Sequence, residues 1–200
     1  MYTIINGSPK INKSNSTYFL EIITKSLDNY NLFELKKDSY EKVIDSINKS
    51  DTIVIAFPLY VDSPPTKVLS LLDYIIDNRI NLKNKLIYIV VNCGFREGIQ
   101  NKTAIDIVKL WCKKTNAKYM SSIQIGAGEI IGNKKYKLLS ITANRKLKEF
   151  SKMIKRKQKH SDIITTVNYL NNKTFCYVAN IFWNKNAKTN NLSEHDIREK

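Results

Sequence analysis

The chain has 200 residues, of which 42% are hydrophobic, and this is enough for one domain with a sizeable core. No stretch approaches the roughly 20 apolar residues that a transmembrane helix needs. The N-terminus carries strand-forming residues where a signal peptide would carry a basic segment and an apolar run. We therefore expect a cytoplasmic protein with no membrane contact.

The formal net charge of +15 comes mostly from lysine, in a chain that is also rich in Asn and Ile. Its densest basic run, over residues 146–159, falls on a predicted helix. We favour a solvated helix face over a nucleic-acid or acidic-partner patch, so nucleic acid is not an expected partner. The three cysteines are widely separated and the acidic residues show no metal-ligand spacing, so we expect neither a disulfide framework nor a metal site.

A strand over residues 2–6 is followed by Gly7-Ser8-Pro9-Lys10, then Ser14-Asn15-Ser16-Thr17, and then a helical pattern over 16–28. Free backbone N–H groups and the positive end of the helix dipole would face one point in such a loop. Short hydroxyl side chains beside a helix start suit the monoester phosphate of a cofactor. The alternative is an ordinary strand-turn-helix joint with Ser14 or Ser16 as the cap.

Strands and helices alternate along the chain. The expected strands are 2–6, 32–36, 52–57, 86–91 and 120–125, and the expected helices cover 16–28, 40–47, 65–76, 105–111 and 137–157. The central strands are too hydrophobic to face water on either side, which predicts a doubly wound α/β fold with a five-stranded parallel sheet in the order 2-1-3-4-5. This order would bring the loops at 7–16, 58–65 and 92–98 together into one site at the carboxyl ends of the strands.

The second and third loops offer a flat surface and close backbone approach. Pro58, Leu59 and Tyr60 form a rigid apolar edge that suits a flat ring. Asn92 could form hydrogen bonds, Gly94 lets the backbone approach a ligand, and Phe95 could stack. A hydrophobic turn and an ordinary strand-to-helix loop are the simpler alternatives. The first loop lacks GxGxxG and GxxxxGK[ST], which disfavours a nucleoside triphosphate.

We place the domain at residues 1–159 and a C-terminal extension at 160–200. The extension contains the apolar stretch 175–183, followed by a polar segment, 184–200, that we expect to be frayed or disordered. The apolar stretch is expected to pack on its own domain or on a partner, and it motivates the prediction of a homodimer.

Four segments in order, GSPK…SNS, FPLYVDSPP, NCGFREGIQ and IGAGE, resemble the flavodoxin-like NAD(P)H-dependent FMN reductases over roughly residues 1–155. The resemblance implies a flavodoxin-like fold and an FMN cofactor. It places the FMN phosphate at Ser8, Lys10, Ser14, Asn15 and Ser16, and the ring between Pro58, Leu59 and Tyr60 on one side and Asn92, Gly94 and Phe95 on the other. The family often has arginine where this chain has Lys10, so bidentate phosphate pairing is lost there.

The resemblance implies hydride transfer from NADH or NADPH to FMN and then to a quinone, a dye or another small acceptor. The flavin carries this chemistry, so no catalytic side chain is expected. Two alternatives remain open: a flavodoxin-type FMN electron carrier without NAD(P)H turnover, and a basic binding module without flavin.

Overall fold

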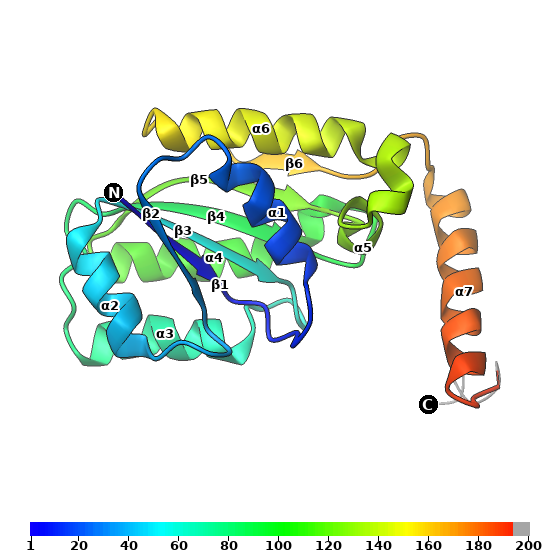
Figure 1. Ribbon diagram of the computed structural model, residues 1–200, viewed down its shortest axis with the longest axis horizontal. Helices are drawn as coiled ribbons and strands as arrows, with labels where there is room; N and C mark the ends of the chain where they lie inside the picture. Colours follow the sequence, from blue (N-terminus) through cyan, green and yellow to red (C-terminus); the bar gives the residue numbers. More distant parts are fainter. Residues whose placement is uncertain (194–200) are drawn as a thin grey trace. The chain divides into compact units, whose positions relative to one another are not determined.

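The computed structural model describes residues 1–193, apart from the side chain of Lys134. It contains a six-stranded, all-parallel sheet in the order β2-β1-β3-β4-β5-β6 (Figure 1). The strands are β1 (Tyr2–Asn6), β2 (Tyr30–Glu34), β3 (Thr52–Pro58), β4 (Leu86–Asn92), β5 (Lys118–Ile125) and β6 (Ile163–Thr165). The α-helices are α1 (Asn15–Thr24), α2 (Tyr40–Lys49), α3 (Thr66–Asp77), α4 (Lys102–Lys114), α5 (Gly128–Ile131), α6 (Ile141–Lys155) and α7 (Asn172–Thr189), with 3-10 turns η1 (Gly98–Asn101) and η2 (Lys134–Ser140).

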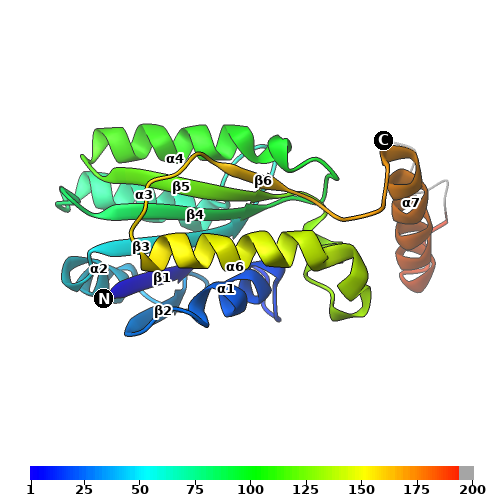
Figure 2. The same cartoon turned by 90° about the horizontal axis from the view of Figure 1, so that it is seen from above.

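Helices cover both faces of the sheet, which explains why the central strands are hydrophobic without alternation. On one face, α2, α3 and α4 pack on a core that includes Ile5, Ile55 and Ile89. On the other face lie α1 and α6, where the fully buried Tyr88 of β4 meets Phe150 of α6 at 5.9 Å between ring centroids. Figure 2 shows α6 and α4 on opposite sides of the strands.

The doubly wound α/β fold is confirmed, but the sheet has six strands and not the predicted five. The additional strand β6 lies beside β5 (Figure 2). It is held through Asp162, whose carboxylate accepts hydrogen bonds from Lys109 at 2.6 Å and from Ser122 N and Oγ at 2.9 Å. The sheet therefore includes residues beyond 159, the position at which the sequence placed the domain boundary. The first compact unit extends to Asn168.

Further boundaries also differ from the sequence prediction. The helix expected over 137–157 begins at Ile141, because residues 134–140 form 3-10 turns with a non-helical Tyr136. The second unit begins at Tyr169 and contains α7, capped by the side chain of Asn171. This helix runs to Thr189, so residues 184–189 are helical where the sequence predicted a frayed segment. Residues 194–200 lie outside the described part of the chain.

Candidate functional site

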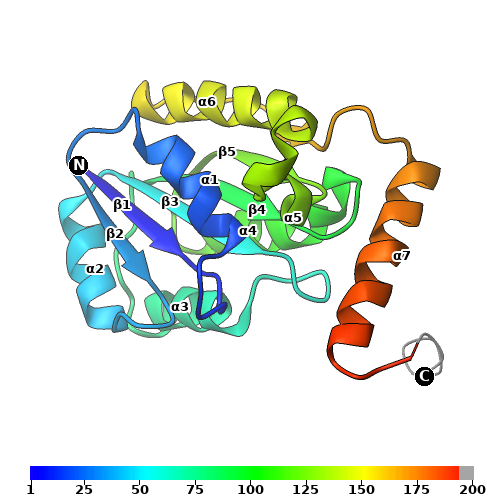
Figure 3. The ribbon, with the colours of Figure 1, turned by 45° about the vertical axis from the view of Figure 1, so that its right-hand side comes forward.

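A cleft of about 140 Å³ lies where β1, β3 and β4 reach their carboxyl ends, the edge shown in Figure 3. Three loops that are distant in the sequence form its walls, and the first turn of α5 contributes one residue. It is lined by Ser8, Lys10, Ser14, Asn15, Ser16, Pro58, Leu59, Tyr60, Asn92, Cys93, Gly94 and Glu129.

The first wall is a capped helix start. Ser14 Oγ accepts a hydrogen bond from Thr17 N at 3.1 Å, so Ser14 is the N-cap of α1. Among the described residues, the backbone N–H groups of Asn15 and Ser16 have no bonding partner, as expected for the first turn of a helix. These donors and the helix dipole favour an anion at this end of the cleft.

The end of β1 is fixed to this helix start by Asn6. Its side chain accepts from Ser8 N at 3.1 Å and donates to Thr17 Oγ1 at 3.0 Å. Gly7 must lack a side chain, because a Cβ there would lie 2.2 Å from Cγ2 of Val68 on α3. The chain therefore leaves β1 along one defined path into the loop.

The second wall contains a tight turn at Tyr60–Ser63. Backbone bonds link Tyr60 N to Ser63 O at 2.9 Å and Ser63 N to Tyr60 O at 3.0 Å. The two central residues, Val61 and Asp62, have φ of +46° and +58°, the geometry of a type I′ turn. A β-branched residue in this region is strained, and strain of this kind is common beside ligand sites.

The third wall is organised by Asn92, which connects all three loops. Its side-chain amide donates to Ser16 Oγ at 3.3 Å and to Phe57 O at 3.2 Å. The backbone carbonyl of Asn92 accepts a hydrogen bond from Leu59 N at 2.7 Å. Gly128 of α5 approaches so closely that a Cβ there would lie 2.7 Å from Asn92 Oδ1. The orientation of this buried amide is thus set by β3, α1 and α5 together.

Beyond Asn92 the backbone is open. Apart from Gly94 and its two neighbours in the chain, no atom of the described residues lies within 4 Å of the position that a Cβ on Gly94 would take, so a ligand can approach the backbone there. Burial raises the pKa of the neighbouring Cys93 thiol to about 11, so it is protonated at neutral pH and is not a nucleophile. Phe95 lies outside the cleft lining and is 57% exposed, while its carbonyl accepts from Ala127 N.

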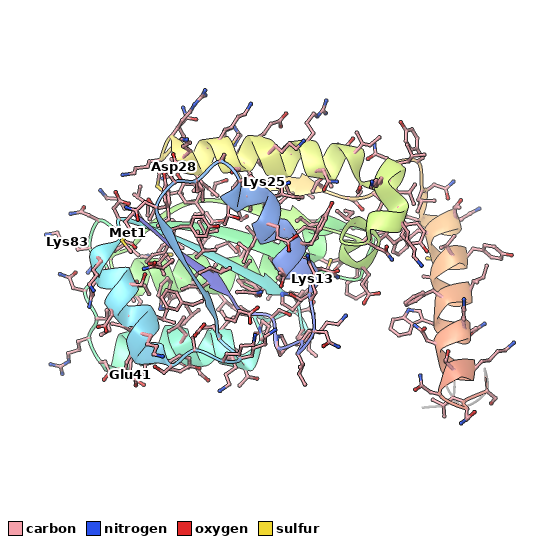
Figure 4. All side chains as sticks on the ribbon, in the orientation of Figure 1. Met1, Lys13, Lys25, Asp28, Glu41 and Lys83 are labelled. Atoms are coloured by element: carbon pink, nitrogen blue, oxygen red, sulfur yellow. The ribbon has the colours of Figure 1, made fainter. Side chains whose placement is uncertain are left out.

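Charges of both signs meet at the cleft, since Lys10 and Glu129 both line it. Lys13, labelled in Figure 4, precedes α1 and forms an ion pair with Glu21 of that helix. Figure 4 also labels Met1 at the opposite edge of the sheet.

All the residues that the sequence nominated for cofactor binding line this cleft except Phe95, and their role as ligands stays a prediction. The structure adds Cys93 and Glu129. Both lie inside the segments NCGFREGIQ and IGAGE, but neither residue type suggests a role there. Residues 1–193 include no helix with the length and apolar character needed to cross a bilayer.

The sequence matches the family described as NADPH-dependent FMN reductase over residues 2–129. The chain belongs to this family. It is therefore an oxidoreductase that uses FMN and a reduced nicotinamide cosubstrate, as the sequence segments predicted. No curated protein sequence matches the chain.

Solved structures agree on the fold. An NADPH-quinone reductase from P. pentosaceus superposes with a TM-score of 0.58 at 19% identity, covering 76% of this chain and 95% of its own. An FMN-dependent NADH-azoreductase from Bacillus anthracis, in complex with FMN, gives 0.56 at 14% identity, covering 76% and 97%. A flavodoxin from Streptococcus pneumonia gives 0.57 at 15% identity, covering 78% and 99%. At these identities the likeness shows the flavodoxin-like fold.

Proposed function

We propose that the cleft at the carboxyl edge of the sheet binds FMN, with the phosphate in the 7–16 loop and the ring between residues 58–60 and 92–94. The observation that carries this proposal is the pair of free N–H groups on Asn15 and Ser16, beside the hydroxyl groups of Ser8 and Ser14 and the ammonium of Lys10. This donor set fits a terminal phosphate dianion. It lacks the glycine spacing of a pyrophosphate site, which favours FMN over FAD.

The remaining lining suits a ring that needs to react on an open side. Pro58, Leu59 and Tyr60 offer an apolar edge, and Tyr60 remains 50% exposed. The unobstructed backbone at Gly94 offers hydrogen-bonding groups without steric hindrance. These residues bind and orient the ring and leave one side accessible.

FMN, when bound, supplies the redox chemistry by accepting a hydride from NADH or NADPH and releasing electrons to an acceptor. We propose a quinone, a dye or another small molecule as that acceptor. The chain then needs no acid or base in the cleft. Asn92 holds the three loops at one relative position, and Cys93 stays a neutral thiol in the wall.

The double variant Ser14→Ala, Ser16→Ala tests the phosphate position. It should weaken FMN binding by about 1–3 kcal/mol, because each hydrogen bond to a charged phosphate contributes on the order of 1.5 kcal/mol or more. Riboflavin, which lacks the phosphate, is the control ligand and should lose less affinity than FMN. Equal FMN affinity in variant and wild type would place the phosphate elsewhere.

Three further expectations stay predictions: a cytoplasmic location, a homodimer, and the absence of a nucleic-acid partner. The basic run over residues 146–159, which begins on α6 and continues past its end, bears on the nucleic-acid prediction. Some of its charges are paired across elements, as in the Lys155–Asp28 contact at 3.0 Å and the Lys157–Asp51 ion pair. Such pairing is consistent with a solvated helix face.

A further inference from the structure

We infer that Lys36 is a positioning residue for the loop that holds the FMN phosphate, an inference that rests on the function proposed above. Its ammonium donates to the backbone carbonyls of Lys10 at 2.7 Å and of Ile11 at 3.1 Å. It also lies 3.7 Å from a carboxylate oxygen of Glu34. Lys36 reaches the loop from outside the cleft and does not line it.

The sheet explains how Lys36 reaches this place. β2 pairs with β1 so that Glu34 lies opposite Asn6, and Leu35 N then donates to Asn6 O at 3.0 Å. Lys36, which follows Leu35, therefore lies beside the loop that follows β1. Only 14% of the Lys36 side chain is exposed, which is unusual because lysine normally keeps its ammonium in water.

The contacts suit an ammonium. Lysine has three N–H donors and no acceptor, and here it meets two carbonyl oxygens and one carboxylate. The loop gains little from packing at this point, since Ile11 is 88% exposed. Lys36 therefore provides bonds from β2 to a part of the loop that the core does not hold.

Peptide geometry gives these bonds a directional effect. In a trans peptide the C=O and the following N–H point to opposite sides. With the carbonyls of Lys10 and Ile11 turned toward Lys36, the N–H groups of Ile11 and Asn12 are turned to the other side of the loop. Neither N–H bonds to another described residue. Lys36 thus fixes the backbone at Lys10, which lines the cleft, and its effect should fall on the phosphate and not on the ring.

Lys37 provides a matched control. It pairs with the same Glu34 at 2.8 Å and carries the same charge, but 68% of its side chain is exposed. The ion pair of Lys37 is with Glu34 and not with the loop. Lys37→Met therefore changes the net charge and the Glu34 pairing as Lys36→Met does, without removing the bonds to Lys10 and Ile11.

The experiment measures binding of FMN and riboflavin to wild type, Lys36→Met and Lys37→Met through the change in flavin fluorescence. Lys36→Met should weaken FMN binding by about tenfold to a hundredfold, because it removes charge-assisted bonds that order the loop. Riboflavin affinity should change by less than about twofold, and Lys37→Met should resemble wild type for both ligands. Equal losses of FMN and riboflavin, or equal FMN losses in the two variants, would overturn the inference.

A second readout needs no flavin. Trypsin cleavage after Lys10 and Lys13 in the ligand-free proteins, followed by mass spectrometry, should be several times faster in Lys36→Met than in wild type or Lys37→Met. Unchanged cleavage would overturn the positioning role. Failure of wild type to bind FMN would instead overturn the proposed site, so the two failures are distinguishable.

Discussion

The side-chain amide of Asn92 donates to Ser16 Oγ at 3.3 Å and so joins the end of β4 to the first turn of α1, across 76 residues of sequence. The same amide donates to Phe57 O on β3 at 3.2 Å. The wall proposed for the FMN phosphate and the wall proposed for its ring are therefore set relative to each other by one buried side chain.

Asn92→Ala should lower both stability and FMN affinity. It leaves Phe57 O without its side-chain donor and removes the link to Ser16, and we expect a loss of about 1–3 kcal/mol in the free energy of unfolding. Urea unfolding of the flavin-free protein measures it. Asn78→Ala removes an exposed amide that donates to Tyr74 O at 2.9 Å, and this control should change stability by less than about 0.5 kcal/mol. Equal effects of the two substitutions would contradict the linking role.

The stabilisation that the Asp162 carboxylate gives to β6 should depend on pH. Burial alone would raise the pKa of Asp162, but hydrogen bonds from Lys109, Tyr119 and Ser122 outweigh it and keep the pKa below its usual value. A lowered carboxyl pKa stabilises the fold at pH values above the unfolded pKa of about 3.9, and this stabilisation is lost as the pH falls through the folded pKa. The stability difference between wild type and Asp162→Asn should therefore be largest near neutral pH and shrink as the pH falls below about 4.

A charge-matched control separates this effect from the general loss of one negative charge. Asp106 pairs with Lys102 on the surface of α4, and Asp106→Asn should cost less than about 0.5 kcal/mol at neutral pH. If the difference in the free energy of unfolding between wild type and Asp162→Asn is the same at pH 7 and pH 3, the carboxylate does not hold β6 through its charge.

The sequence predicted β1, β3 and β4 because each is a buried apolar run bounded by turn residues. It placed the second strand at 32–36, whereas β2 spans Tyr30–Glu34, an edge strand whose side chains are largely exposed. It missed β6, since three residues, Ile163–Thr165, carry no periodic signal, and the donors that anchor Asp162 come from α4 and β5. It also gave no helix for Phe175–Trp183. The apolar residues of α7 surround the helix and form no single stripe, so helical periodicity was absent there.

The candidate site followed from topology, because carboxyl ends of parallel strands meet at one edge. Residues whose place at the site depends on tertiary contacts could not be predicted in this way. Glu129 reaches the cleft from a four-residue helix, and Lys36 reaches the loop only because β2 pairs with β1. The aromatic ring of Phe95, next to Gly94, suggested a stacking role. In the structure the backbone carbonyl of Phe95 accepts a hydrogen bond from Ala127 N, and its side chain does not line the cleft.

Relief of strain at Val61 should stabilise the protein. Val61→Asn places a residue that tolerates positive φ in the type I′ turn, and we expect a gain of about 1 kcal/mol. Val61→Thr keeps the β-branch and should gain nothing. Urea unfolding of both variants measures the difference. Equal stability of the two would show that the turn stores no strain at this residue.

The homodimer prediction rests on α7, whose exposed apolar side chains are Tyr177, Val178, Ile181, Phe182 and Trp183. The full-length chain should sediment as a dimer at micromolar concentration, and Phe182→Lys should shift it toward monomer by placing a charge in the apolar contact. Leu110→Lys changes an equally apolar exposed residue on α4 and should leave the dimer intact. A monomeric wild-type protein would contradict the prediction.

Anaerobic mixing of the FMN-loaded protein with excess NADH, and separately with NADPH, tests whether the bound flavin is reduced by a nicotinamide cosubstrate. If the cleft holds FMN with one side of the ring accessible, at least one cosubstrate should bleach the flavin absorption band, and a quinone added afterwards should restore it. A band that stays unchanged over many minutes with both cosubstrates would contradict the reductase function and favour an electron carrier of the flavodoxin type.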